Sequence, residues 1–170
     1  MTSPSTATAD ATTSTSARTR AAVPARHPLI DRLLAVTGGR EVRPDDIEAF
    51  EQEGGEAVLF FGGDPVRFPE ALDVAVVLPE LLAALGSSGS TGTRVGVVPR
   101  DVEDALARRY AVQRWPSIVF LRDGGYLGTL SGMHDWDVYL REAAHVLAQA
   151  PGRRPTPTIA IHAAADPACH

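Results

Sequence analysis

The stretch RYAVQRWPSIVFLRDGG, which spans Arg109–Gly125, decides the fold of this chain. Pro116 is expected to start a strand that runs through the apolar residues to Leu121. Asp123-Gly124 is typical of a tight two-residue turn. The residues from Tyr126 to Leu130 then predict a returning strand, so the stretch is expected to form a β-hairpin.

Upstream of this hairpin, predicted strands alternate with predicted helices. Ala57–Phe61 is an apolar run between glycines and predicts a buried strand. A helix over Glu70–Leu85, which Pro79 should kink, follows it. Arg94–Val98 predicts the next strand, and Asp101 or a neighbouring residue is expected to cap the helix that leads to the hairpin. Parallel strands joined by helices, followed by an antiparallel hairpin, predict an α/β domain with a mixed sheet.

The first and last helices complete this domain. Apolar residues on one face predict a helix over His27–Val36, and a short strand is expected over Arg40–Arg43. Pro44 is expected to open a second helix with two aspartates in its first turn. Asp135 is expected to be the N-cap of a last amphipathic helix.

The two ends of the chain differ in composition from its middle. Residues 1–26 are mostly Ser, Thr and Ala with almost no large apolar side chain, so this tail is expected to be disordered. Residues 151–170 contain several prolines and the pair Arg153-Arg154, and they are expected to form a second flexible tail. One folded domain is therefore expected over residues 27–150.

The charge of the chain narrows its possible partners. The formal net charge is −5, and residues 27–150 hold nineteen Asp and Glu against eleven Arg, which gives −8. An acidic domain argues against nucleic-acid binding, which needs clustered cations, and suits a basic peptide partner. No apolar run is long enough to span a membrane, so no membrane insertion is expected.

Several segments resemble thioredoxins over roughly residues 56 to 148. They are Val58-Leu59-Phe60-Phe61, Leu78-Pro79-Glu80-Leu81, Trp115-Pro116-Ser117 and Gly132. The resemblance implies a thioredoxin-like α/β fold, with a mixed sheet flanked by helices and a cis peptide bond before Pro116. In thioredoxins this proline lies against a redox-active cysteine pair.

This chain has no such cysteine pair. Counting forward from the strand places Pro65-Val66-Arg67-Phe68 there, and counting back from Pro79 places Ala71-Leu72-Asp73-Val74 there. Leu59 replaces the buried carboxylate of thioredoxins, and the single cysteine is Cys169, next to the last residue. Disulfide exchange requires thiolates, so we expect a binding protein and no enzyme.

A closer resemblance concerns four other blocks. They are Phe60–Glu70, Asp73–Leu81, Val95–Arg100 and Gly132–Trp136, and together they are similar to the HyaE/HupG (HoxO) family. Members of this family are thioredoxin-like accessory proteins of nickel–iron hydrogenase maturation. The resemblance implies a non-catalytic cytoplasmic chaperone that binds the hydrogenase small-subunit precursor, including its twin-arginine signal peptide, alone or with other accessory proteins. The alternative is a redox-inactive interaction module with a different client.

Two sets of residues are candidates for binding such a peptide. The first is an acidic run that would pair with arginines of the signal peptide, or else form an ordinary solvated helix face; it comprises Asp45, Asp46, Glu48, Glu51, Glu53 and Glu56. The second is a groove at Trp115-Pro116, where an extended peptide would pair with the main chain. The loop from Asp64 to Phe68 would line the other side of this groove. Alternatively, Trp115 fills the space of the missing disulfide.

The remaining reactive side chains predict no further site. His27, His134 and His145 are scattered, and His162, Cys169 and His170 lie in the last residues, so no metal and no cofactor is expected. A residual oxidoreductase that uses Cys169 is a third, less favoured hypothesis. Met133 and Trp136 could form an exposed apolar patch, but packing of Trp136 against the hairpin is the favoured interpretation.

Overall fold

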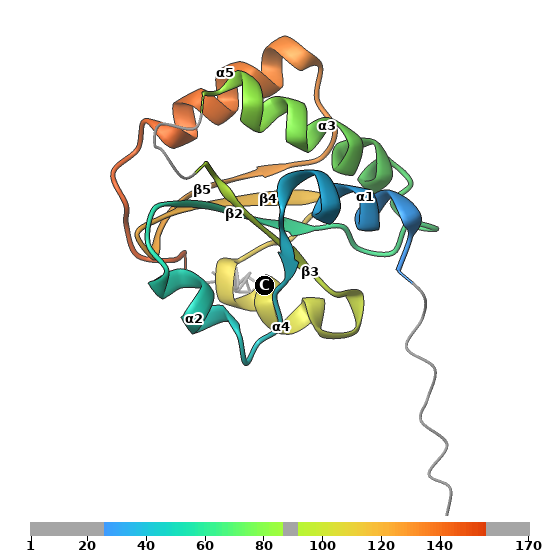
Figure 1. The fold of residues 1–170 in the computed structure, drawn as a ribbon, viewed down its shortest axis with the longest axis horizontal. Helices are drawn as coiled ribbons and strands as arrows, with labels where there is room; N and C mark the ends of the chain where they lie inside the picture. Colours follow the sequence, from blue (N-terminus) through green and yellow to red (C-terminus); the bar gives the residue numbers. More distant parts are fainter. Residues whose placement is uncertain (1–25, 87–91, 156–170) are drawn as a thin grey trace, which may run out of the picture.

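A five-stranded sheet of order β1-β3-β2-β4-β5 organises the computed structural model, which describes residues 26–86 and 92–155 (Figure 1). The strands are β1 (Arg40–Glu41), β2 (Glu56–Phe61), β3 (Arg94–Val98), β4 (Ser117–Arg122) and β5 (Gly125–Ser131). The helices are α1 (Pro28–Thr37), α2 (Ile47–Gln52), α3 (Glu70–Ala84), α4 (Glu103–Tyr110), which the short 3₁₀ turn η1 (Arg100–Val102) precedes, and α5 (Trp136–Leu147).

The strand directions confirm the predicted mixed sheet. β1 and β2 both pair with β3 in parallel, whereas β4 pairs with β2 and β5 pairs with β4 in antiparallel fashion. The hairpin turn also forms as predicted, because Asp123 and Gly124 both have positive φ angles, of 49° and 76°. A two-residue turn of this type matches the right-handed twist of the strands that it joins.

The sheet separates two layers of core side chains. Helices α1, α3 and α5 cover one face, and α2 and α4 cover the other (Figure 1). Alternation along β2 supplies both layers, because Val58 and Phe60 enter the first core while Leu59 and Phe61 enter the second. This explains why the strand is apolar at nearly every position.

Two helix starts differ from the predictions. α2 begins at Ile47 instead of Pro44, because residues 44–46 form a turn in which the Asp46 carboxylate accepts a 3.4 Å hydrogen bond from the Arg43 N–H. Asp101 does not cap α4; it lies in η1, and its carboxylate pairs with Arg43 at 3.1 Å. Asp101 thus forms an ion pair with Arg43, 58 residues away, instead of the predicted helix cap.

The described contacts extend beyond residue 150, where the sequence placed the end of the folded domain. Gly152 forms an isolated antiparallel bridge with Tyr126 at the outer edge of β5, with N···O distances of 2.9 and 3.1 Å. A Cβ atom at Gly125 would lie 2.5 Å from Cβ of Pro151, so only glycine permits this close approach. We call residues 150–155 the C-terminal strap. No helix within the described ranges is both long and apolar enough to cross a membrane.

Candidate functional site

The Trp115–Pro116 peptide bond is cis, as the sequence predicts, and it lies at the start of β4. Two contacts fix the main chain around it. The Gly132 N–H donates to the Pro116 carbonyl at 2.7 Å, and the Ser117 hydroxyl donates to the Arg114 carbonyl at 2.7 Å. The cis bond is thereby held between β4 and the end of β5.

The loop Gly62–Phe68 lies against Trp115, as predicted. The Phe68 and Trp115 rings stack with centroids 5.9 Å apart and planes at 26°. Gly63 makes this stack possible, since its φ is +68° and a Cβ atom there would lie 2.8 Å from Phe68 and 2.9 Å from Trp115. Phe68, from the segment that forward counting places at the cysteine pair, therefore fills space beside the cis-proline.

Beneath this stack lies Glu103, a buried carboxylate that the sequence analysis did not select. Its side chain is 4% exposed, and Oε1 accepts a 3.0 Å hydrogen bond from the Gly63 N–H. Burial raises the pKa of Glu103 above its ordinary value, and the Gly63 N–H and the nearby Trp115 indole, which both favour the carboxylate, offset only part of that effect. The buried Trp115 Nε1–H lies near this carboxylate but does not reach hydrogen-bond geometry with any described residue.

A signal for Glu103 was present in the sequence. Glu103, Leu106, Ala107 and Tyr110 share one face of α4 at the spacing i, i+3, i+4, i+7, and all four are buried. A glutamate on the apolar stripe of a helix must find a hydrogen-bond donor when it is buried. Here the donor is the main chain of the loop at the candidate site.

Apolar side chains near the cis-proline are exposed. Val66, at the tip of the loop, is 88% exposed, and Met133, next to the Gly132 that binds Pro116, is 46% exposed. Trp136 is 42% exposed, so the favoured prediction that it packs against the hairpin is wrong. Tyr139, three residues further along α5, is buried instead. Apolar side chains that stay exposed are candidates for contact with a partner.

We call the surface formed by Gly62–Phe68, Trp115–Pro116 and Met133 the Trp115 face. Asp64 shapes its loop, because its carboxylate accepts a 3.0 Å hydrogen bond from the Val66 N–H and pairs with Arg100 at 2.7 Å. Among the described residues, the main-chain N–H and C=O of Trp115 have no hydrogen-bond partner. The face therefore combines apolar contact area with open main-chain groups.

The acidic residues between Asp45 and Glu56 do not form a single cluster in the structure. Glu51 accepts hydrogen bonds from Tyr110, Arg109 and Arg154 at 2.6 to 2.8 Å, and Glu53 pairs with Arg40 and Arg94. Glu56 pairs with Arg122 at 2.8 Å. The chain's own arginines thus neutralise the second half of the run. Asp45, Asp46 and Glu48 remain exposed, with Arg109 3.8 Å from Glu48.

The structure does not bring the two candidate sets together. Pro116 comes directly before the first residue of β4. Glu51 lies near the other end of that strand, beside Gly124 in the hairpin turn, where an added Cβ atom would lie 3.2 Å from the Glu51 carbonyl oxygen. Six residues of strand separate the two ends by roughly 20 Å. Asp64, Phe68, Trp115 and Pro116 thus form one site, and Glu51 and Glu53 belong to another part of the surface.

The described side chains carry no constellation for metal or thiol chemistry. Within residues 26–86 and 92–155, no three His, Cys, Asp or Glu residues converge to hold a metal ion. His134 is occupied in packing, with its ring 5.1 Å from that of Tyr139 and its Nε2 3.1 Å from the Ser131 carbonyl. Cys169, His162 and His170 lie outside the described residues.

Comparison with known proteins identifies the family. The model of the family described as hydrogenase-1 expression protein HyaE matches residues 29–139. The chain belongs to the HyaE family. It is 47% identical over 146 residues to the hydrogenase expression/formation protein HoxO of Cupriavidus necator. This alignment covers 84% of this chain and 88% of that protein.

A second relative agrees with this assignment, and a solved structure shows the fold. The hydrogenase expression/formation protein HupG of Bradyrhizobium diazoefficiens is 39% identical over 113 residues, covering 66% of this chain and 74% of that protein. A protein with a thioredoxin fold superimposes with a TM-score of 0.50 at 13% identity, covering 68% of this chain and 96% of that one. This HyaE-family chain therefore has the thioredoxin-like fold that the sequence predicts.

Proposed function

We propose that this protein acts in hydrogenase maturation as a non-catalytic chaperone, and that it binds the precursor of the nickel–iron hydrogenase small subunit in the cytoplasm. Its HyaE-family relatives are named hydrogenase expression/formation proteins, which supports a role in hydrogenase maturation. The main structural support for a non-catalytic binding role is the stacking of Phe68 on Trp115 beside cis-Pro116. Aromatic rings occupy the region where a thioredoxin holds its thiols, so this region offers contact area in place of redox chemistry.

The Trp115 face suits the apolar part of a twin-arginine signal peptide. An extended segment can pair with the open main chain of Trp115, as in other cases of β-augmentation. Its side chains would then contact Val66 and Met133, which are already exposed. Glu103 and Gly63 hold the loop in place before the peptide arrives, which lowers the entropic cost of binding.

The cationic part of the same peptide needs carboxylates outside this apolar surface. Asp45, Asp46 and Glu48 are exposed at the start of α2, and Arg43 links this region to the start of α4 through Asp101. Exposed ion pairs are worth only about 0–1 kcal/mol each, so the acidic residues would tune affinity and association rate more than they anchor the client.

The test is binding of the purified protein to the small-subunit precursor, with and without its signal peptide, measured by calorimetry. Val66→Asp places a charge on the Trp115 face and should weaken binding about tenfold or more, because burying a valine contributes about 1.5 kcal/mol. Val36→Asp is the matched control: Val36 is 61% exposed on α1, which covers the opposite face of the sheet from α4.

The outcomes separate the alternatives. Removal of the signal peptide should abolish most of the binding. Equal binding by Val66→Asp and the unchanged protein would refute the Trp115 face as the site. Equal binding without the signal peptide would refute the signal-peptide part and leave a chaperone of the mature subunit. No binding in either form would favour an interaction module with a different client. Insulin-disulfide reduction that Cys169→Ser abolishes would refute the non-catalytic role.

A further inference from the structure

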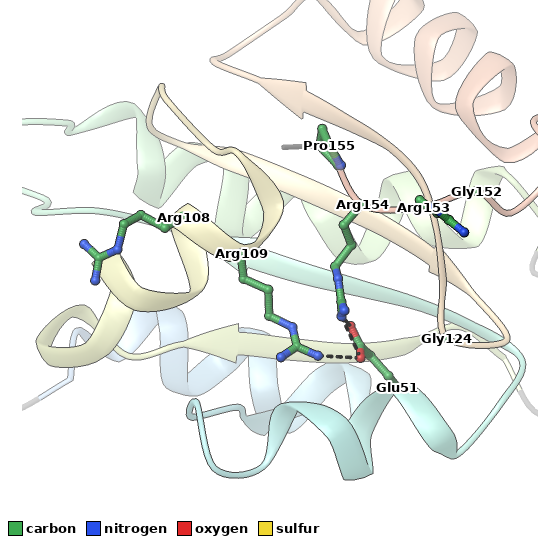
Figure 2. Close-up of a pocket in the computed structure, with 8 residues that line it drawn as sticks. All are labelled: Glu51, Arg108, Arg109, Gly124, Gly152, Arg153, Arg154 and Pro155. Atoms are coloured by element: carbon green, nitrogen blue, oxygen red, sulfur yellow. Dashed lines mark hydrogen bonds and ion pairs between the residues drawn. The ribbon is translucent and has the colours of Figure 1, made fainter. Parts of the chain in front are cut away.

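The C-terminal strap is held by two specific contacts at the end of the sheet opposite the Trp115 face. Its main chain pairs with the outer edge of β5 at Tyr126, and its Arg154 side chain reaches Glu51 on α2 (Figure 2). Arg154 Nη1 lies 2.8 and 3.1 Å from the two Glu51 carboxylate oxygens. A segment far along the chain thus binds in an extended form, through one main-chain pair and one arginine.

The carboxylate that receives Arg154 is oriented without the strap. Tyr110 donates to Glu51 Oε1 at 2.6 Å, and Arg109 donates to Oε2 at 2.8 Å, both from the last turn of α4. A carboxylate offers about four acceptor positions, so these two donors leave room for a third. Desolvation acts to raise the pKa of Glu51, but the hydrogen bonds from Tyr110, Arg109 and Arg154 outweigh it and lower the pKa. Glu51 therefore presents a charged acceptor.

The spacing of Gly152 and Arg154 in the strap matches its two contact points, Tyr126 and Glu51. In an extended segment, alternate residues face the same side, so the main-chain pair at Gly152 and the side chain of Arg154 can engage one surface together. Arg153, between them, points away from Glu51 (Figure 2). Its side chain is exposed, and it forms no ion pair with any described residue.

The strap covers its site only loosely. A hollow of about 530 Å³ remains between the strap, the end of α4 and the hairpin turn. Its lining consists of Glu51, Arg108, Arg109, Gly124, Gly152, Arg153, Arg154 and Pro155. The Arg154 side chain is 40% exposed and the Glu51 side chain 11%, so solvent reaches this ion pair from the arginine side. One main-chain bridge and one partly exposed ion pair are few contacts, and segments held by few contacts open locally while the rest of a domain stays folded.

We propose that Glu51 and the edge of β5 at Tyr126 form a second binding site, for an extended segment of a partner protein that carries arginine, and that the C-terminal strap occupies this site in cis until such a segment displaces it. The strap shows the chemistry that the site accepts, which is a main-chain pair followed two residues later by a guanidinium. This inference rests on contacts about 20 Å from the Trp115 face and does not depend on the proposed function.

The test uses the full-length protein labelled with ¹⁵N and a capped peptide of the chain's own residues 149–155, QAPGRRP. Amide chemical shifts report weak binding and locate it. Arg154→Ala weakens the strap in cis and should tighten binding of the added peptide about tenfold, since occupancy of the site by the strap lowers the apparent affinity in proportion. The shifts should centre on Gly124, Tyr126 and Glu51.

Arg153→Ala is the matched control, because it removes the same charge from the neighbouring residue and should leave the affinity unchanged. Adding Glu51→Gln to Arg154→Ala should abolish the gain, while the amide oxygen still accepts from Tyr110 and preserves the fold. Equal peptide affinity for Arg154→Ala and Arg153→Ala would overturn the proposal. So would binding that persists with Glu51→Gln, or shifts confined to the Trp115 face. Val66→Asp, which tests the proposed function, should not change binding of this peptide.

Discussion

Two glutamates lie at opposite ends of α4 and differ in their surroundings: Glu103 is the first residue of that helix, and Glu51, on α2, contacts its last turn. Glu103 begins α4, is buried, and receives one hydrogen bond from the Gly63 main chain. Glu51 is held by Arg109 and Tyr110 at the other end of α4, together with Arg154. Burial raises the pKa of Glu103, whereas for Glu51 the donors overcome the effect of burial and lower the pKa. The hydrogen-bond donors decide the difference, since burial acts in the same direction on both: Tyr110, Arg109 and Arg154 together outweigh it at Glu51.

This comparison assigns different properties to the two ends of the sheet. At the Trp115 face, the buried carboxylate of Glu103 supports a loop, and the surface of that loop exposes the apolar Val66. At the hairpin end, the largely buried, ion-paired carboxylate of Glu51 accepts a segment from elsewhere in the chain. One end is therefore suited to apolar contact and the other to recognition of guanidinium groups.

The largest expected effect concerns the support that Glu103 gives to its loop. Glu103→Ala leaves the Gly63 N–H without a partner and opens a cavity, so the free energy of unfolding should fall by about 2–4 kcal/mol. Glu103→Gln keeps an acceptor of the same shape and should stay within about 1 kcal/mol of the unchanged protein. Urea unfolding measures both. If the two variants lose the same stability, the hydrogen bond to Gly63 is not what holds the loop.

A smaller effect should distinguish the two glutamates by pH. The pKa of Glu103 is raised in the folded state, so its contribution favours folding at low pH and is lost as pH rises through that raised pKa. The pKa of Glu51 is lowered, so its contribution is present above its ordinary value, near pH 4.5, and is lost as pH falls through the lowered pKa.

As pH rises from 4 to 7, Glu103→Gln should therefore gain stability relative to the unchanged protein, and Glu51→Gln should lose stability. Both variants carry a neutral side chain of the same shape as glutamate, so each serves as the control for the other. Unfolding midpoints in urea across this range provide the measurement. Parallel curves for the two variants would contradict the contrast drawn above.

The smallest expected effect concerns the exposed ion pair at the Trp115 face. Arg100 pairs with Asp64 at 2.7 Å, but its side chain is 61% exposed, so Arg100→Ala should change the free energy of unfolding by about 0–1 kcal/mol. Arg43→Ala, which breaks the similarly exposed pair with Asp101, is the control. A larger loss for Arg100→Ala, measured by thermal unfolding, would show that the loop depends on Asp64 as well as on Glu103.

Local sequence was sufficient for most of the fold. The apolar runs of β2, β3 and β4 and the Asp123-Gly124 turn carry signals within a few residues, and the structure confirms them. The cis peptide bond before Pro116 is confirmed too, but its prediction came from the resemblance to thioredoxins. The contact of the Gly62–Phe68 loop with Trp115 was also predicted, although this prediction depended on the resemblance to thioredoxins. Glu103 was missed despite its position on the buried stripe of α4.

The sequence could not show how the acidic run is divided. Its partners, Arg40, Arg94, Arg109 and Arg154, lie up to 103 residues away, and only the folded chain brings them to α2. The strap was missed for a related reason. Its composition of Pro, Gly and Arg is that of a loose tail, and the contacts that place it, with the outer edge of β5 and with Glu51, are far away in the sequence.

The Phe68–Trp115 stack has a consequence for engineering this region. The rings fill the space down to the main chain of Gly63, where a single added methyl group would collide with both. Phe68→Cys would remove one ring and leave the indole without its neighbour, so a thiol cannot be introduced there without loss of packing. A redox pair built into this region would need further substitutions that refill the space beside Trp115.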